Sequence, residues 1–174
     1  MPEAQDKVYL LDANVIIHAH DYYYHMERVP EFWGWILHHA ANGSIKMPVE
    51  IMEEVKGGDE ALHAQWMKSA DVKALLALDE QWDLGLLNQV ISKGYITDPT
   101  EDQIELMGQD PFLITYALGD PKRRVIISNE TPRPSVKGAK RKVPDVCHDF
   151  GIECYSVYYL LKVLNFKTSW ATTI

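Results

Sequence analysis

The chain has 174 residues, a length typical of one domain, and 47% of them are hydrophobic and 24% charged. No apolar run approaches the roughly 18 residues that a membrane span needs, and the first residues carry acids where a signal peptide carries basic residues. We therefore expect residues 1–174 to form one cytoplasmic domain without membrane association. The net charge of −8 argues against nucleic-acid binding over the whole surface.

The first predicted elements alternate between strand and helix. Residues 7–11 (KVYLL) form an apolar run typical of a buried parallel strand, and Asn14 is the expected cap of the helix that follows. Pro30 begins a second helix, which Gly43 ends, and residues 44–47 are expected to form a short strand.

Helical patterns recur through the middle of the chain, at residues 48–55, 59–69, 79–93, 100–108 and 110–119. Residues 72–78 fit a helix or a strand equally well.

The last third of the chain returns to strands. Residues 125–128 (VIIS) predict a buried strand, residues 129–144 a basic loop, 145–150 a helical turn, 152–155 a strand and 156–164 a helix. Strands separated by helices indicate an α/β fold, a three-layer α/β/α sandwich with a central parallel sheet. Ligands of such folds bind beyond the carboxyl ends of the strands.

Five acids stand close to the expected strand and helix ends: Asp12, Glu54, Asp110, Glu130 and Asp145. Carboxylates gathered at one edge repel, and they raise one another's pKa unless a cation compensates. Mg²⁺, or Mn²⁺, suits hard oxygen ligands, and one or two such ions can activate water against a scissile phosphate. No side-chain nucleophile is then required, which agrees with the absence of a GxSxG or Cys/His signature.

Each acid also has a structural explanation. Aspartate is a favoured helix cap, which would account for Asp12, Asp110 and Asp145, and Glu130 could pair with neighbouring basic residues. Glu54 shares one helical face with Glu50, so spacing alone leaves both open.

Residues 122–142 hold eight basic side chains and one acid within an otherwise acidic chain. Such a segment could hold nucleic-acid phosphates by charge, or it could be a solvated loop. The candidate RNA contacts are Arg123, Arg124, Arg133, Lys137, Lys140, Arg141 and Lys142.

The ordered motifs resemble those of PIN-domain ribonucleases, the fold of VapC-type toxins, over about residues 7–164. LLDANVII resembles the first motif, with Asp12 as a metal-binding acid and Asn14 as its support. PVEIMEEV resembles the second and favours Glu54, and QDPFLITYAL resembles the third and favours Asp110.

The fourth motif departs from the family pattern. In VIISNE, Ser128 stands where the family has threonine and Glu130 where it has aspartate, and the next acid, Asp145, follows only after the basic loop. The fourth acid is therefore Glu130 or Asp145. YYYHMERVPEFWGW and KVPDVC resemble stretches of a subgroup of larger PIN-like proteins.

The resemblance implies a three-layer α/β/α fold and a Mg²⁺-dependent endoribonuclease that leaves 5′-phosphate and 3′-hydroxyl ends. It also implies RNA as substrate, a toxin held inactive by a cognate antitoxin protein, and a homodimer. Two alternatives stay open. One is a degenerate PIN-like module that binds RNA or protein, and the other is a phosphatase with Asp12 as nucleophile, although such enzymes usually carry a second aspartate where Asn14 stands.

Other chemistry-bearing residues predict structural roles. Five of the seven histidines lie in the first 40 residues: His18, His20, His25, His38 and His39. HAH suggests zinc, but positions i and i+2 of a helix do not face each other and no HExxH accompanies them, so we expect packing or surface histidines. Cys147 and Cys154 are expected to be small, buried side chains without a disulfide, and Trp33 and Trp35 to lie in the core or at an interface.

Overall fold

The computed structural model describes residues 6–57 and 60–172. Its sheet contains four parallel strands in the order β2-β1-β3-β4, which are β1 (Val8–Leu11), β2 (Ile45–Lys46), β3 (Arg124–Ile127) and β4 (Cys154–Tyr155). The register pairs Leu11 with Ile127 and Leu10 with Lys46, so the carboxyl ends of the neighbouring strands lie at one edge.

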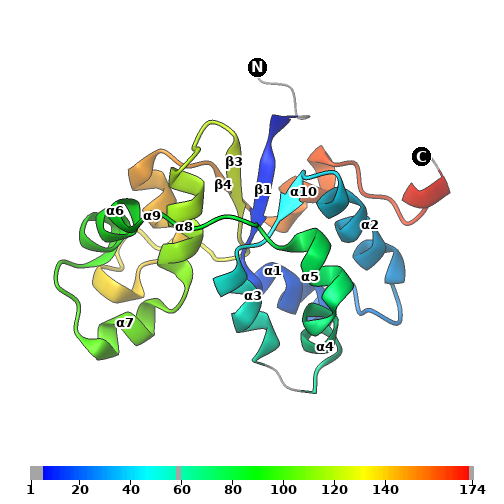
Figure 1. Ribbon diagram of the computed structural model, residues 1–174, viewed down its shortest axis with the longest axis horizontal. Coiled ribbons are helices and arrows are strands. Elements are labelled where there is room, and N and C mark those ends of the chain that lie inside the picture. The colour runs from blue at the N-terminus through cyan, green and yellow to red at the C-terminus, as the bar shows by residue number, and fades with distance from the viewer. Residues whose placement is uncertain (1–5, 58–59, 173–174) are drawn as a thin grey trace.

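Helices cover both faces of this sheet, as Figure 1 shows for α8 and α9 on one side and α2 and α10 on the other. The chain runs outward from β1 to β2, then back past β1 to β3 and on to β4. The predicted three-layer α/β/α fold with a central parallel sheet is confirmed.

The helices and helical turns span α1 (Ala13–His18), η2 (Ala19–Tyr23), α2 (Pro30–Ala41), α3 (Val49–Lys56), α4 (Leu62–Lys68), α5 (Ala70–Leu76), α6 (Leu84–Gln89), η3 (Val90–Tyr95), α7 (Glu101–Met107), α8 (Asp110–Leu118), η4 (Gly138–Lys140), α9 (Val143–Phe150), α10 (Val157–Val163) and η5 (Trp170–Thr172). Helix α2 begins at the predicted Pro30, and Thr100 forms a full capping box with Gln103 at α7. No helix among the described residues is both long and apolar enough to cross a membrane.

Two local expectations need correction, and one open alternative is resolved. Asp12, not Asn14, stands at the cap position of α1, and its side chain makes no capping bond because the carboxylate is turned to other partners. The ambiguous residues 72–78 belong largely to α5, and the helix expected from residue 79 begins only at Leu84.

The core lies on both faces of the strands and includes Tyr9, Leu10, Ile126 and the two tryptophans of α2, Trp33 and Trp35. Those tryptophans therefore pack inside the domain, one of the two roles expected for them. Both cysteines are free; Cys147 is buried in α9, as expected, whereas Cys154 is only half-buried in β4.

Candidate functional site: acids at the carboxyl edge of the sheet

Asp12 occupies the carboxyl end of the interior strand β1 and is only 4% exposed. Its Oδ2 atom accepts hydrogen bonds from Asn14 Nδ2 at 2.8 Å and from Ser128 Oγ at 2.7 Å. Asn14 lies in the first turn of α1 and Ser128 directly follows β3. Two neighbouring strand ends thus hold the carboxylate in one orientation.

Asn129 extends this network, and no sequence motif pointed to it. Its backbone N–H donates to Asn14 Oδ1 at 2.9 Å, and its side-chain Oδ1 accepts from the N–H of Val157 at 3.1 Å. Its Nδ2 donates to the hydroxyl of Tyr23 at 3.2 Å. Asn129 therefore ties the supporting amide of Asn14 to η2 and to the start of α10.

Glu130 reaches from the end of β3 to the start of α9. Its Oε2 accepts the Val143 N–H at 2.8 Å, and its Oε1 accepts from Lys142 Nζ at 3.1 Å. The Glu130 N–H donates to Ser128 Oγ at 3.2 Å, so the serine hydroxyl connects Glu130 to Asp12. Both carboxylate oxygens of Glu130 already have protein donors.

Glu54 arrives from α3 and meets the turn before α8. Its Oε1 accepts the Gln109 N–H at 3.1 Å. Gly108 has a φ of +55°, and a Cβ added there would lie 3.2 Å from the same oxygen. A glycine at this position lets the turn approach the carboxylate closely. Glu50, on the same face of α3, is instead bound by the hydroxyl of Tyr116 at 3.3 Å.

The carboxylates of four segments act on one another through their charges, and the pKa values of Asp12 and Asp110 record this effect. Burial is the largest cause that raises the pKa of Asp12 to about 6, and the charges of Glu130 and Glu54 contribute to that rise. The Ser128 hydrogen bond opposes that rise.

The pKa of Asp110, which lies in the first turn of α8, is raised more strongly than that of Asp12. Burial is the largest cause that raises its pKa to about 8, followed by the charge of Asp12. Glu130 and Glu54 add to the rise, and the ammonium of Lys142 opposes it. Burial also raises the pKa of Glu54. A cluster of this kind favours a bound cation, because a cation removes the repulsion that raises these pKa values.

The spacing of the acids indicates which ion would fit. No three of them, all within the described chain, bring ligand oxygens within 4.8 Å of one another. Mg²⁺ keeps several of its waters and is bound through one or two carboxylates. The donor set is therefore compatible with a partly hydrated Mg²⁺ and less compatible with a closed cage of protein ligands.

Tyr95 is a second side chain that sequence patterns did not identify. It ends η3 and is buried, and its hydroxyl has no hydrogen-bond partner among the described residues. Burial raises its pKa, and the charge of Asp110 is the next largest cause. The phenol therefore stands as an unused donor close to Asp110.

Asp145 is placed apart from the other acids. It is buried in the first turn of α9, and its Oδ2 accepts the Arg133 N–H at 2.7 Å. It lines a cavity of about 780 Å³ together with Lys93 and Arg141, and none of the other four acids lines that cavity. The charge of Glu130 acts on both Asp12 and Asp110, whereas the Asp145 carboxylate accepts a hydrogen bond from the basic loop, so this geometry favours Glu130 over Asp145 as the fourth acid.

The predicted basic segment does not form one continuous rim. Arg123 and Arg124 lie at the amino end of β3, at the opposite edge of the sheet from the acids. Arg124 pairs with Glu80, NH2 to Oε2 at 2.7 Å, and Arg123 pairs with Asp6 at 3.2 Å. Neither arginine therefore lies at the edge of the sheet that carries the acids.

The remaining basic side chains of residues 122–142 fall into two groups: some are paired with other residues of the fold, and others are exposed to solvent. Arg141 pairs with Asp149 at 2.7 Å and donates to the Gly94 carbonyl at 2.6 Å, so it is used within the fold. Lys142 faces the acids through Glu130. The exposed basic side chains of the loop are Arg133, Lys137 and Lys140.

The family model described as a domain of unknown function, DUF4411, matches residues 9–168. That match covers nearly the whole chain, so the chain belongs to this family. No curated protein and no solved structure matches it.

Proposed function

We propose that this protein is a Mg²⁺-dependent endoribonuclease whose site is formed by Asp12, Glu54 and Asp110, with Glu130 in support. The observation that carries the proposal is electrostatic. Burial and mutual repulsion raise the pKa of both Asp12 and Asp110, and Lys142 is the one cation that acts on Asp110 among the causes resolved for it. A divalent cation would supply the missing positive charge.

The chain's own residues divide the work. Asn14 and Ser128 orient the Asp12 carboxylate, and the Gln109 N–H orients Glu54. Glu130 contributes charge through bridging water, because both its oxygens already accept bonds from Lys142 and Val143. When bound, Mg²⁺ supplies the charge that activates water and stabilises a scissile phosphate.

RNA is supported as substrate by the exposed basic loop. Arg133, Lys137 and Lys140 are exposed on the segment between β3 and α9, which begins beside Ser128 and ends beside Lys142. Basic side chains so placed would hold backbone phosphates while the acids act on one of them. The ordered resemblance to PIN-domain ribonucleases points to the same substrate class.

The test is cleavage of a mixed RNA substrate with Mg²⁺, with Mn²⁺ and with EDTA, using wild type, Asp12→Asn and the matched control Asp71→Asn. Asp71 is an exposed aspartate of α5. We expect metal-dependent cleavage by wild type and the control, and none by Asp12→Asn with its fold intact by circular dichroism. Folded protein that binds RNA without metal-dependent cleavage would support a binding module instead, and a trapped aspartyl-phosphate would support a phosphatase.

A further inference from the structure

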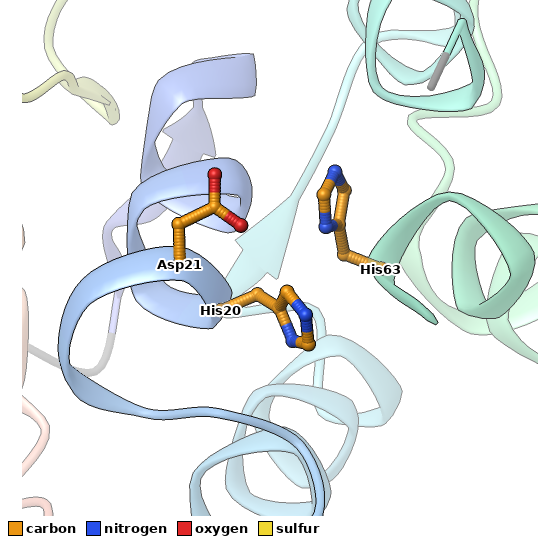
Figure 2. A group of neighbouring side chains, drawn as sticks. All are labelled: His20, Asp21 and His63. Carbon is orange, nitrogen blue, oxygen red and sulfur yellow. The ribbon is translucent and has the colours of Figure 1, made fainter. Parts of the chain in front are cut away.

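A second group of metal-capable side chains lies outside the acid cluster. His20 and Asp21 come from η2, and His63 comes from α4. Their ligand atoms all lie within 4.8 Å of one another. Figure 2 shows the carboxylate of Asp21 and the ring of His63 turned toward each other, with the His20 ring beside them.

His63 provides an independent reason to look for a ligand. Its side chain is 7% exposed, and its Nδ1 has no hydrogen-bond partner among the described residues. A buried polar atom left without a hydrogen bond destabilises the fold, so such an atom needs an explanation. A metal ion bound to this nitrogen would satisfy its lone pair. The neighbouring His20 and Asp21 side chains are suitable ligands for the same ion.

His20 is also available as a ligand. It is 8% exposed, and its Nδ1 accepts a bond of 3.5 Å from the Met26 N–H. That distance exceeds the usual 2.7–3.2 Å range, so the bond does not hold the imidazole firmly. The rings of His25 and Trp33 lie against His20, with centroids at 4.3 and 6.4 Å, and limit its access to water.

The backbone explains why helical spacing misses this group. HAH falls where α1 passes into the π-helical turn η2, and His18 lies on the α1 side of that change. The partner of His20 is therefore His63, which is brought in by the packing of a different helix, with ring centroids 5.1 Å apart.

We propose that His20, Asp21 and His63 form a binding site for a divalent transition metal, with Zn²⁺ the ion that fits the ligand set best. Two imidazoles and one carboxylate suit a borderline ion rather than Mg²⁺. Zn²⁺ bonds of 2.0–2.2 Å in a tetrahedron place ligand atoms about 3.3 Å apart. Rotation of the exposed Asp21 side chain can bring its carboxylate oxygen to that distance from the imidazole nitrogens. A water would be the fourth ligand.

The consequence of binding is a cross-link between η2 and α4. Tyr23, on the same turn, accepts the hydrogen bond from Asn129, which supports Asn14 beside Asp12. An ion at this site would therefore stabilise η2, which supports the acid cluster through Tyr23. The ligands of the ion would lie outside that cluster.

The experiment uses the full chain without a histidine tag, from which metal is removed with EDTA. The protein is then titrated with Zn²⁺ in millimolar Mg²⁺, and competition with a coloured chelator measures its affinity for Zn²⁺. We expect one Zn²⁺ per chain, a higher melting temperature with Zn²⁺, and visible absorption typical of imidazole ligation when Co²⁺ replaces it. His63→Gln and Asp21→Asn should each weaken Zn²⁺ binding at least about tenfold.

The controls separate this site from the acid cluster and from surface histidines. Asp12→Asn and His148→Gln, the latter at a side chain 90% exposed, should bind Zn²⁺ like wild type. Asp21 is exposed, so Asp21→Asn remains a decisive variant if His63→Gln does not fold. Zn²⁺ binding that is absent, unchanged in Asp21→Asn, or lost in Asp12→Asn would overturn the proposal.

Discussion

Ser128 Oγ lies 2.7 Å from Asp12 Oδ2 and donates a hydrogen bond to it across 116 positions of sequence. The contact exists because β1 and β3 are neighbours in register, with Leu11 opposite Ile127, so the residues that follow them emerge side by side. This bond lowers the pKa of Asp12 against the larger effect of burial.

Removal of this hydroxyl should therefore disturb both the fold and the acid. Ser128→Ala leaves the buried carboxylate with one donor fewer, so we expect a loss of about 1–3 kcal/mol in the free energy of unfolding. We also expect the acidic limb of the pH–rate profile for RNA cleavage to move to higher pH. Ser128→Thr keeps the hydroxyl and should behave like wild type; an unchanged profile for Ser128→Ala would contradict the role given to this bond.

The raised pKa values predict how stability depends on pH. A carboxyl whose pKa is higher in the folded chain stabilises the fold below its unfolded pKa, and that contribution is lost as pH rises through the folded value. For Asp12 and Asp110 the loss should occur between about pH 4 and the folded values of about 6 and about 8. The shift of Asp12 corresponds to about 3 kcal/mol.

Urea unfolding at pH 5 and pH 8 checks this prediction. In EDTA, the wild type should be less stable at pH 8, Asp12→Asn should lose less, and Mg²⁺ should restore stability at pH 8 more than at pH 5. Equal stability of wild type at both pH values, with no effect of Mg²⁺, would contradict the assignment of a cation to these acids.

Glu54 and Glu53 offer a matched pair on one helix. Glu54→Gln keeps an oxygen for the Gln109 N–H but removes the charge, so we expect cleavage to fall at least about 100-fold while the fold persists. Glu53 is exposed and pairs with Lys56 at 2.7 Å, so Glu53→Gln should cleave at the wild-type rate. Initial rates with saturating Mg²⁺ compare the two, and equal rates would remove Glu54 from the site.

The basic loop predicts the salt dependence of RNA binding. Replacement of the exposed cations Arg133, Lys137 and Lys140 with alanine should weaken binding of single-stranded RNA. It should also reduce the slope of log affinity against log salt by about 2, because each phosphate contact contributes about 0.7. Lys122→Ala, near the opposite edge of the sheet, should leave the slope unchanged. Fluorescence anisotropy at several salt concentrations, with EDTA to prevent cleavage, measures both slopes.

The architecture could be predicted from the sequence because its signals are local. Apolar runs marked β1 and β3, prolines and capping residues marked the starts of α2, α7 and α8, and the alternation of strand and helix indicated a parallel sheet. The sequence also predicted that the acids gather at one place, because residues that follow parallel strands meet at one edge of the sheet. The departures were local too: the capping preference of Asn14 was overridden by its bond to Asp12.

The direction of each side chain and the contacts between distant segments were decided only by the tertiary structure. Glu130 and Asp145 are equivalent candidates for the fourth acid by sequence, and only the structure shows that the Asp145 carboxylate accepts a hydrogen bond from the Arg133 N–H. The sequence by itself determined most of the strands and helices, because their formation depends on near neighbours. It could not determine that His20 meets His63, since a π-helical turn changes where His20 points and the packing of α4 supplies its partner.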